Sequence, residues 1–529
     1  MRIGYPMTQR LLTIVIFISL AAMAHMANAQ QVKIGSGIVE GKTSVDGTIQ
    51  TFLGIPYAAA PVGDLRWREP QPPKPWKGVR PAKEFGARCM QGNIYSDMVF
   101  RDPGPSEDCL YLNVWSPAKS PSAKLPVMVW IHGGGFQAGA TSEPRQDGQF
   151  LARKGVVVVS MNYRLGIFGF FSHPELTKES PHHASGNYGL MDQAAAIQWV
   201  KRNISAFGGD PSNITIFGES AGSMSVSGQM ASPVTRDLLR HAIGESGAFF
   251  ENKHSKSLVE TEQLGSQFAQ SLGADSLAKL RAMPAQQLLD AVLKQESEKF
   301  WPNVDGYFLP ESVSSIYAKG EQAHIPLLAG WNRDEGSWRS FFGNQAPTQE
   351  NYIASVKAKY GTGSETILKA FPSNTEEEIK QSAALLSTMD FIAFGTWKWI
   401  EGQLATGKAP VYRFQFDQAR PAAPDDKDPD AGKLANHSAE IEYVFGTLKS
   451  KALPFTPEDY ALSDAMMTYW ANFARTGDPN SSGLPNWPQY TAQDKYDVMR
   501  LKGPVPQASP DDKREQYEEM EKAVQKGGK

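Results

Sequence analysis

Ser220 stands between two glycines at the end of an apolar run, in the sequence Gly-Glu-Ser-Ala-Gly over residues 218–222. The residues before it, 214–217, are Ile-Thr-Ile-Phe and predict a buried strand. The pattern G-x-S-x-G after a strand is typical of a tight turn that exposes the serine hydroxyl at the N-terminus of a helix. There, free N–H groups favour the negative charge that develops when the serine attacks a carbonyl carbon. The spacing predicts nucleophilic catalysis by Ser220.

An upstream loop has the composition of an oxyanion hole. The apolar stretch 127–131 predicts a strand, and it continues into His-Gly-Gly-Gly over residues 132–135. Three glycines by themselves also fit a flexible turn, but here they follow a buried strand and precede the serine turn. We therefore expect the backbone N–H groups of Gly134, Gly135 and Ala221 to bind the negative oxygen of a tetrahedral intermediate.

The base is selected by its order along the chain. Hydrolases with this serine turn carry the acid next and the histidine last. Four of the nine histidines follow Ser220, namely His241, His254, His324 and His437. A predicted strand over 325–331 leads into Asp334 and Glu335, and only His437 lies beyond these two acids. The order thus predicts His437 as the base and leaves Asp334 and Glu335 both open as the acid.

The elements that must position these residues alternate between strands and helices. The stretch 156–161 predicts another buried strand and 190–206 predicts a helix, a pattern that favours an α/β fold with a mostly parallel central sheet. No charged or low-complexity linker divides the chain, so we expect one domain over residues 30–529. Two helical stretches, 252–299 and 351–407, are expected to form a cap over the carboxyl edge of the sheet, where ligands bind.

These motifs together make the chain resemble the type-B carboxylesterase and cholinesterase-like family of α/β-hydrolases, including bacterial para-nitrobenzyl-esterase-like enzymes. The resemblance runs through almost all of the chain after residue 29. The motifs that carry it include 107–114 (EDCLYLNV), 186–193 (GNYGLMDQ), 207–222 and 437–446 (HSAEIEYVFG). It implies an α/β-hydrolase fold in which helices flank the sheet and a helical cap covers an active-site gorge.

The resemblance also implies roles for particular residues. The family's D-E-G motif uses its glutamate, which makes Glu335 the acid. Glu219 and Ser246 are expected to contact the catalytic groups on the side away from the substrate. The motif around Ser246 departs from the family pattern, because residue 245 is glutamate where the family usually has glutamine. Trp331 is also unusual, at a position where relatives often carry a small residue. The same resemblance implies a disulfide between Cys89 and Cys109, the only cysteines, and a loop over 90–101 that borders the gorge.

The N-terminus predicts export. Arg2 and Arg10 precede the apolar run 11–24, and Ala-Asn-Ala over 27–29 offers a cleavage site, so residues 1–29 are predicted to be a signal peptide. The run is shorter than the roughly 20 apolar residues of a membrane-spanning helix. The cleavage site also offers no cysteine for a lipid. We therefore expect a periplasmic or secreted protein without a membrane anchor.

Composition argues against several classes of partner. The formal net charge of −3 gives no indication of nucleic-acid binding or of a basic membrane patch. No metal-ligand spacing or nucleotide-binding loop is present, so no cofactor or metal is expected. The charged stretch 511–529 is expected to be a solvated or frayed helix. The sequence does not indicate an oligomeric state.

The leading functional interpretation is a carboxylic ester hydrolase that works through an acyl-enzyme on Ser220. One alternative is a specialised hydrolase with the same machinery, acting on a lactone, thioester, phenolic ester or toxin ester. Another is a non-catalytic binding protein, which the presence of Ser220, Glu335 and His437 argues against. Because His437 must be neutral to act as a base, activity should rise with pH through an apparent pKa of roughly 6 to 7. Five aromatic residues are candidates to line the substrate pocket: Phe136, Phe249, Phe250, Phe300 and Trp301.

Overall fold

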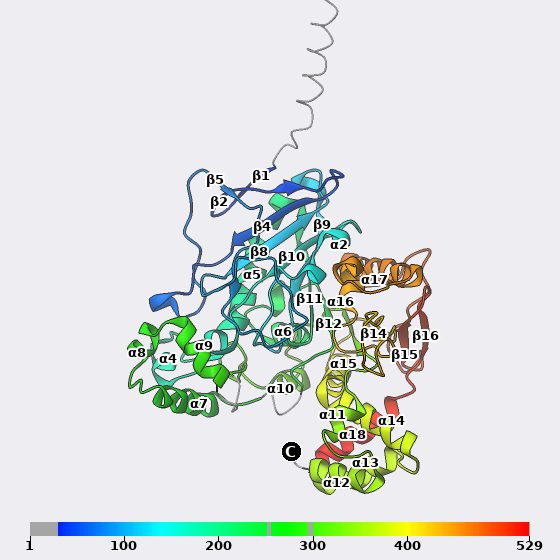
Figure 1. Ribbon diagram of the computed structural model, residues 1–529. Coiled ribbons are helices and arrows are strands. Elements are labelled where there is room, and N and C mark those ends of the chain that lie inside the picture. Colours follow the sequence, from blue (N-terminus) through cyan, green and yellow to red (C-terminus); the bar gives the residue numbers. More distant parts are fainter. Residues whose placement is uncertain (1–29, 251–254, 295–299, 528–529) are drawn as a thin grey trace, which may run out of the picture.

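A large twisted sheet forms the centre of the protein (Figure 1). The computed structural model describes residues 30–250, 255–294 and 300–527, so the predicted signal peptide lies outside the described residues. The sheet has eleven strands in the order β16-β15-β14-β13-β12-β11-β9-β10-β8-β4-β3. The strands are β3 (Lys42–Thr43), β4 (Gln50–Pro56), β8 (Tyr111–Ser116), β9 (Leu125–Ile131), β10 (Val157–Met161), β11 (Gly209–Glu219), β12 (His241–Glu245), β13 (Leu327–Asn332), β14 (Val411–Phe416), β15 (Asp497–Leu501) and β16 (Gln507–Pro510).

The middle of the sheet is parallel, as the alternation of strands and helices predicted. Neighbours from β10 to β15 run parallel, and the pairs at both edges are antiparallel. A small second sheet of β1 (Gln31–Ile34), β2 (Gly37–Glu40) and β5 (Val79–Pro81) lies beside β4. Parallel strands bring their carboxyl ends to one edge, so residues that follow different strands meet there.

Both faces of the sheet are buried, which explains the near-continuous apolar strands. Ile214 and Ile216 of β11 point into one core, whereas Phe217 points into the other. The first core receives helices α5 (Tyr188–Asn203) and α6 (Ala221–Ala231). The second core receives α16 (Ile441–Phe445) and α17 (Pro457–Thr476).

Further helices form two groups below the sheet in the view of Figure 1. One group, in green, contains α7 (Leu258–Ser271), α8 (Leu277–Ala282) and α9 (Ala285–Lys294). The other, mostly yellow-green, contains α11 (Trp338–Phe342), α12 (Gln349–Tyr360), α13 (Ser364–Ala370), α14 (Glu376–Thr388) and α15 (Phe394–Thr406). A π-helical turn, η9 (Met389–Ala393), joins α14 to α15. The two groups correspond to the helical stretches that the sequence predicted as a cap.

The C-terminal helix differs from the prediction. Helix α18 (Arg514–Gly527) is not a frayed or fully solvated tail, because it packs against α13 and buries Tyr517, Met520 and Ala523. These three residues recur every third position and so share one face of the helix. The prediction failed because the many charged residues of this segment dominate its composition, and the apolar face is narrow.

The disulfide expected between Cys89 and Cys109 is present. It joins the end of β6 (Arg88–Cys89) to Cys109, two residues before β8, and so closes the loop that carries residues 90–108. No helix in the described part of the chain is both long enough and apolar enough to cross a membrane.

Candidate active site

Ser220 occupies a strained turn between β11 and α6. Its φ is +56°, a conformation that residues with a side chain rarely adopt. The turn requires its flanking glycines because a Cβ on Gly222 would lie 2.0 Å from the carbonyl oxygen of Ile131, and a Cβ on Gly218 would meet the same oxygen at 2.6 Å. The backbone N–H of Ser220 donates to the carbonyl of Glu245 at 2.8 Å. The hydroxyl is thereby fixed at the carboxyl edge of the sheet.

The structure brings Ser220, His437 and Glu335 into one line of hydrogen bonds. Ser220 Oγ lies 3.0 Å from His437 Nε2, and His437 Nδ1 lies 2.6 Å from Glu335 Oε2. Glu335 follows β13 and is buried, whereas His437 stands in the loop before α16. A serine hydroxyl can therefore donate to an imidazole whose other nitrogen donates to a carboxylate.

Asp334, which chain order could not separate from Glu335, points elsewhere. Its Oδ2 accepts from Arg333 Nε at 2.9 Å and from the backbone N–H of Ala435 at 2.8 Å. These contacts tie the end of β13 to the loop that carries His437. Asp334 thus positions the loop, while Glu335 alone of the two acids meets the imidazole.

Ser246 lies behind Glu335, on the side away from His437. Its hydroxyl donates to Glu335 Oε1, and the N–H of Asn332 donates to the same oxygen at 2.8 Å. Ser246 also has a positive φ of +57°, so its backbone is held in an uncommon conformation to aim this hydroxyl. Two donors on one oxygen leave Oε2 free to face the imidazole.

Glu219 is the second carboxylate at the imidazole. Its Oε1 lies 3.2 Å from His437 Nε2. Burial raises the pKa of Glu219 above its ordinary value, and the positive charges of His437 and Arg145 counteract part of this rise. Burial lowers the pKa of His437, but the Glu219 and Glu335 carboxylates outweigh it, so the His437 pKa lies above its ordinary value. Sequence reasoning missed a further buried acid, Glu440, whose Oε2 accepts from Asn332.

Gly134, Gly135 and Ala221 lie at the same cavity as Ser220. The φ angles of Gly134 and Gly135 are +102° and +61°, which only glycine adopts easily. Gly135 is also crowded, since a Cβ there would lie 3.1 Å from the hydroxyl of Tyr95. The loop can present N–H groups to an oxygen bound beside Ser220 because its backbone carries no side chains.

The cavity in front of Ser220 has a volume of about 560 Å³ and mixes apolar and polar walls. Of the five aromatic residues proposed from the sequence, Trp301 lines it, whereas Phe136, Phe249 and Phe250 are buried in the core and Phe300 is partly buried against that core. Phe391 in η9 lines the cavity as well, with its ring 4.9 Å from the His437 ring. Neither Phe391 nor Arg145, another lining residue, was marked by any sequence motif.

A nucleophilic hydroxyl, an imidazole base, a carboxylate and glycine N–H donors at the carboxyl edge of a parallel sheet define a serine hydrolase of the α/β type. Among the described residues, no group of His, Cys, Asp and Glu side chains is arranged to hold a metal ion.

Comparisons with known proteins identify the family. The sequence profile described as "Carboxylesterase family" matches residues 28–520. The para-nitrobenzyl esterase of Bacillus subtilis is 37% identical over 471 residues, covering 86% of this chain and 91% of that protein. The fumonisin B1 esterase of Sphingopyxis macrogoltabida is 37% identical over 474 residues, covering 86% and 83%. A crystal structure of a Geobacillus stearothermophilus carboxylesterase superposes with a TM-score of 0.79 at 31% identity, covering 92% of this chain and 99% of that one.

The chain belongs to the carboxylesterase family. The α/β-hydrolase fold predicted from the sequence is confirmed, and the protein is a serine carboxylic ester hydrolase.

Proposed function

We propose that the protein hydrolyses small-molecule carboxylic esters with Ser220 as nucleophile, His437 as general base and acid, and Glu335 as the carboxylate that orients the imidazole. The observation that carries this assignment is the line of hydrogen bonds from Ser220 Oγ through His437 to Glu335, open to the cavity at its serine end.

The first half of the reaction acylates the serine. His437 Nε2 takes the hydroxyl proton as Ser220 Oγ attacks the ester carbonyl carbon. The carbonyl oxygen becomes negative and is stabilised by the N–H groups of Gly134, Gly135 and Ala221. When the intermediate collapses, the bond to the alcohol oxygen breaks and His437 gives its proton to that oxygen. Glu335 stabilises the positive imidazolium throughout.

The second half releases the acid. A water molecule enters where the alcohol left, and His437 Nε2 takes its proton as the water oxygen attacks the acyl carbon. The second tetrahedral intermediate uses the same N–H groups, and its collapse returns the proton to Ser220 Oγ. The carboxylic acid product then leaves through the cavity.

The test is hydrolysis of a graded series of para-nitrophenyl esters by the wild type and Ser220→Ala. We expect wild-type turnover with a burst of para-nitrophenol, and a loss of kcat of at least about 10⁴-fold in the variant. A Ser220→Ala variant that retained turnover would exclude Ser220 as the nucleophile.

A specialised substrate is the second candidate. It is favoured by the relative named fumonisin B1 esterase, which is as similar to this chain as the para-nitrobenzyl esterase. Parallel kcat/KM measurements on simple alkyl esters and on fumonisin B1 separate the two: a kcat/KM at least about 100-fold higher on one class identifies that class as the substrate.

We also propose that residues 1–29 are a signal peptide and that the mature protein is periplasmic or secreted. The Cys89–Cys109 disulfide supports this proposal, since disulfides persist in oxidising compartments. N-terminal sequencing of the exported protein should give Gln30 as the first residue. A chain retained in the cytoplasm with Met1 intact would contradict it.

A further inference from the structure

Arg145 places a buried positive charge in the wall of the active-site cavity. It belongs to the short helix η4 (Pro144–Gln146), and its side chain is 4% exposed. The cavity wall also contains five larger apolar side chains: Met98, Met224, Trp301, Phe391 and Ile392. Burial of a guanidinium costs free energy unless hydrogen-bond partners satisfy its N–H groups. The partners of Arg145 therefore show which of its donors are left for a ligand.

The partners of Arg145 leave part of the guanidinium open. Its Nε lies 2.7 Å from Glu143 Oε1, and its Nη1 donates to Ser438 Oγ at 3.2 Å. The carboxylate of Asp97 is 3.6 Å from Nη1, beyond ordinary hydrogen-bond length. Nη2 makes no hydrogen bond to any residue that the structure describes. Because a guanidinium offers five donors in a planar fork, one edge remains for a ligand.

The orientation of this guanidinium is fixed from behind. Thr447 Oγ1 donates to the carbonyl of Arg145 at 2.6 Å. Gln146 accepts from Trp130 Nε1 at 2.8 Å and donates to Glu143 Oε2 at 2.7 Å. The carboxylate that pairs with Nε is therefore itself held in place. The Arg145 side chain is thus already ordered before a ligand binds. Binding then costs little conformational entropy, which raises the affinity.

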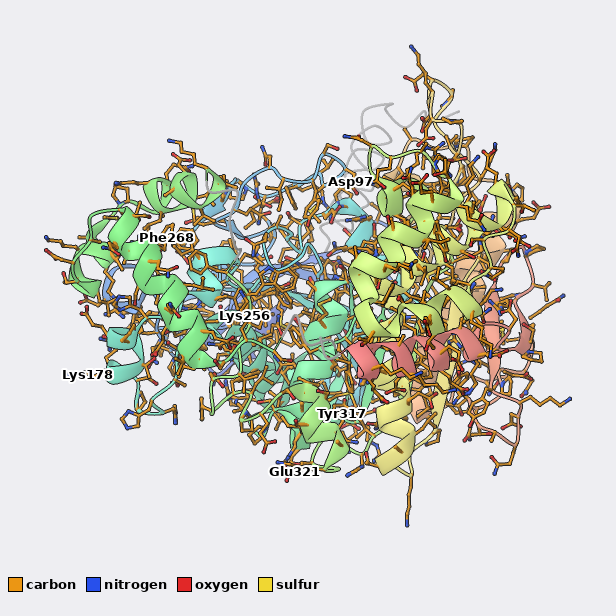
Figure 2. The ribbon with its side chains drawn as sticks, turned by 90° about the horizontal axis from the view of Figure 1, so that it is seen from below. Asp97, Lys178, Lys256, Phe268, Tyr317 and Glu321 are labelled. Atoms are coloured by element: carbon orange, nitrogen blue, oxygen red, sulfur yellow. A yellow bond between two sulfur atoms is a disulfide. The ribbon has the colours of Figure 1, made fainter. Side chains whose placement is uncertain are left out.

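Asp97 approaches Arg145 from the mouth of the cavity. Figure 2 shows it between the green helices α7–α9 and the yellow-green helices of the second group. Its side chain is 51% exposed, so its charge is screened by water and its contact with Arg145 is loose. A carboxylate arriving from solution can displace it and accept from Nη1 and Nη2 together, which is the geometry that arginine favours.

We propose that Arg145 binds a carboxylate of the substrate, so that the protein prefers esters that carry a free carboxylate besides the ester it cleaves. The inference rests on the proposed esterase function. Ser438, which Arg145 contacts, directly follows His437, so the bound carboxylate lies near the reacting ester. Three other acids lie near Arg145: Glu143 faces its Nε, Glu442 pairs with Arg420, and Glu219 faces the imidazole of His437.

The test compares pairs of esters in which a neutral group replaces the carboxylate. One pair places the charge on the alcohol part: the butyrate esters of para-hydroxybenzoate and para-hydroxybenzamide. The other places it on the acyl part: the monophenyl ester of glutaric acid and phenyl pentanoate. The measured quantity is the ratio of kcat/KM for the anionic ester to kcat/KM for its neutral partner. In at least one pair this ratio should exceed about 10 in the wild type and fall at least about tenfold in Arg145→Gln, mainly through KM.

A second variant tests the inference independently of whether Arg145→Gln folds. Asp97→Asn changes a half-exposed side chain, removes the competing carboxylate, and should raise the same ratio severalfold. Arg153→Gln is the matched control, because Arg153 pairs with Asp46 at the surface, and it should leave both esters of each pair unchanged. Salt should lower the wild-type ratio, since screening weakens the attraction between charges.

A wild-type ratio near or below one in both pairs, unchanged in Asp97→Asn, would overturn the inference while neutral esters are still cleaved. Hydrolysis of no ester at all would instead overturn the proposed function itself. The pair that shows the preference also tells which half of the substrate carries the carboxylate.

Discussion

Glu219 Oε1 lies 3.2 Å from His437 Nε2, almost as close as the hydroxyl of Ser220, which is 3.0 Å from the same nitrogen. The imidazole therefore faces two possible partners at one atom. When His437 is neutral, Nε2 accepts from Ser220. When His437 is protonated, Nε2–H can donate to the Glu219 carboxylate, which stabilises the inactive, charged form of the base.

Replacement of Glu219 by Gln should move the acid limb of the pH–rate profile. The Glu219 carboxylate raises the pKa of His437, so its removal lowers that pKa and leaves the imidazole neutral at lower pH. We expect the apparent pKa of kcat/KM to fall by roughly one unit or more. The measurement is a pH profile of kcat/KM on a neutral ester from pH 5 to 10.

The carboxylates around His437 also change the expected wild-type profile. Sequence reasoning gave an apparent pKa of roughly 6 to 7, near the ordinary histidine value. With Glu219 and Glu335 beside the ring, we expect the wild-type acid limb above that range. An identical limb in wild type and Glu219→Gln would show that Glu219 does not act on His437 electrostatically.

Ser246→Ala tests whether the support behind Glu335 affects catalysis. The variant removes the hydroxyl that donates to Glu335 Oε1. A hydrogen bond to a charged group contributes about 1.5–3 kcal/mol, so kcat should fall roughly 10- to 100-fold with little change in KM. Ser382→Ala is the control, because Ser382 donates to a backbone carbonyl, that of Pro372, in the second helix group. An equal fall in kcat in the two variants would show that the Ser246 hydroxyl has no specific effect on catalysis.

The parts of the site that could be predicted from the sequence are those that depend on residues adjacent in the chain. Ser220 and the glycine loop are marked by local glycines, because the backbone there must turn sharply or approach another strand. His437 follows from chain order alone. Asp334 and Glu335 could not be separated by spacing, since they share one turn and only the direction of each side chain decides which meets the imidazole.

Other features depend on contacts between distant segments and leave no local pattern. Contacts with Glu143, Ser438 and Thr447 hold Arg145 at the cavity. The residues next to Arg145 in the sequence form no motif that indicates this position. Strand β11 begins at Gly209, before the apolar run at 214, because Gly209 pairs with Leu125 of β9. Hydrophobic periodicity detects burial and not such pairing.

Loss of the Cys89–Cys109 disulfide should destabilise the fold and loosen the cavity wall. The two cysteines are separated by 20 positions, and closing a loop of this size contributes about 3 kcal/mol in the chain-entropy model. The closed loop carries Tyr95, Asp97 and Met98, which line the cavity. A double Cys89→Ala and Cys109→Ala variant should show a lower Tm and a higher KM. Thiol titration of the unfolded wild type without reductant should detect no free thiol, and two free thiols would contradict the disulfide.

Trp331 connects the sheet to the C-terminal helix, which accounts for a large residue at this position. The Arg413 guanidinium lies 4.1 Å from the centre of its ring, and the ring of Tyr517 in α18 lies 5.4 Å away. Arg413 is fully buried and also pairs with Asp511, just before α18. The indole thus covers a buried charge and supports the helix at the same time.

Trp331→Ala should therefore release α18 as well as lower stability. Truncation of a buried tryptophan costs about 3–5 kcal/mol, and the guanidinium loses its aromatic face. We expect a lower Tm and rapid proteolytic removal of residues 514–527 under native conditions. Trp331→Phe, which keeps an aromatic ring over Arg413, should retain most of the protection. Trp76→Ala, a partly buried tryptophan near the N-terminal strands, controls for the loss of an indole elsewhere. Cleavage of the C-terminal helix at equal rates in Trp331→Ala and Trp76→Ala would show that α18 is held by its other contacts and not by this ring.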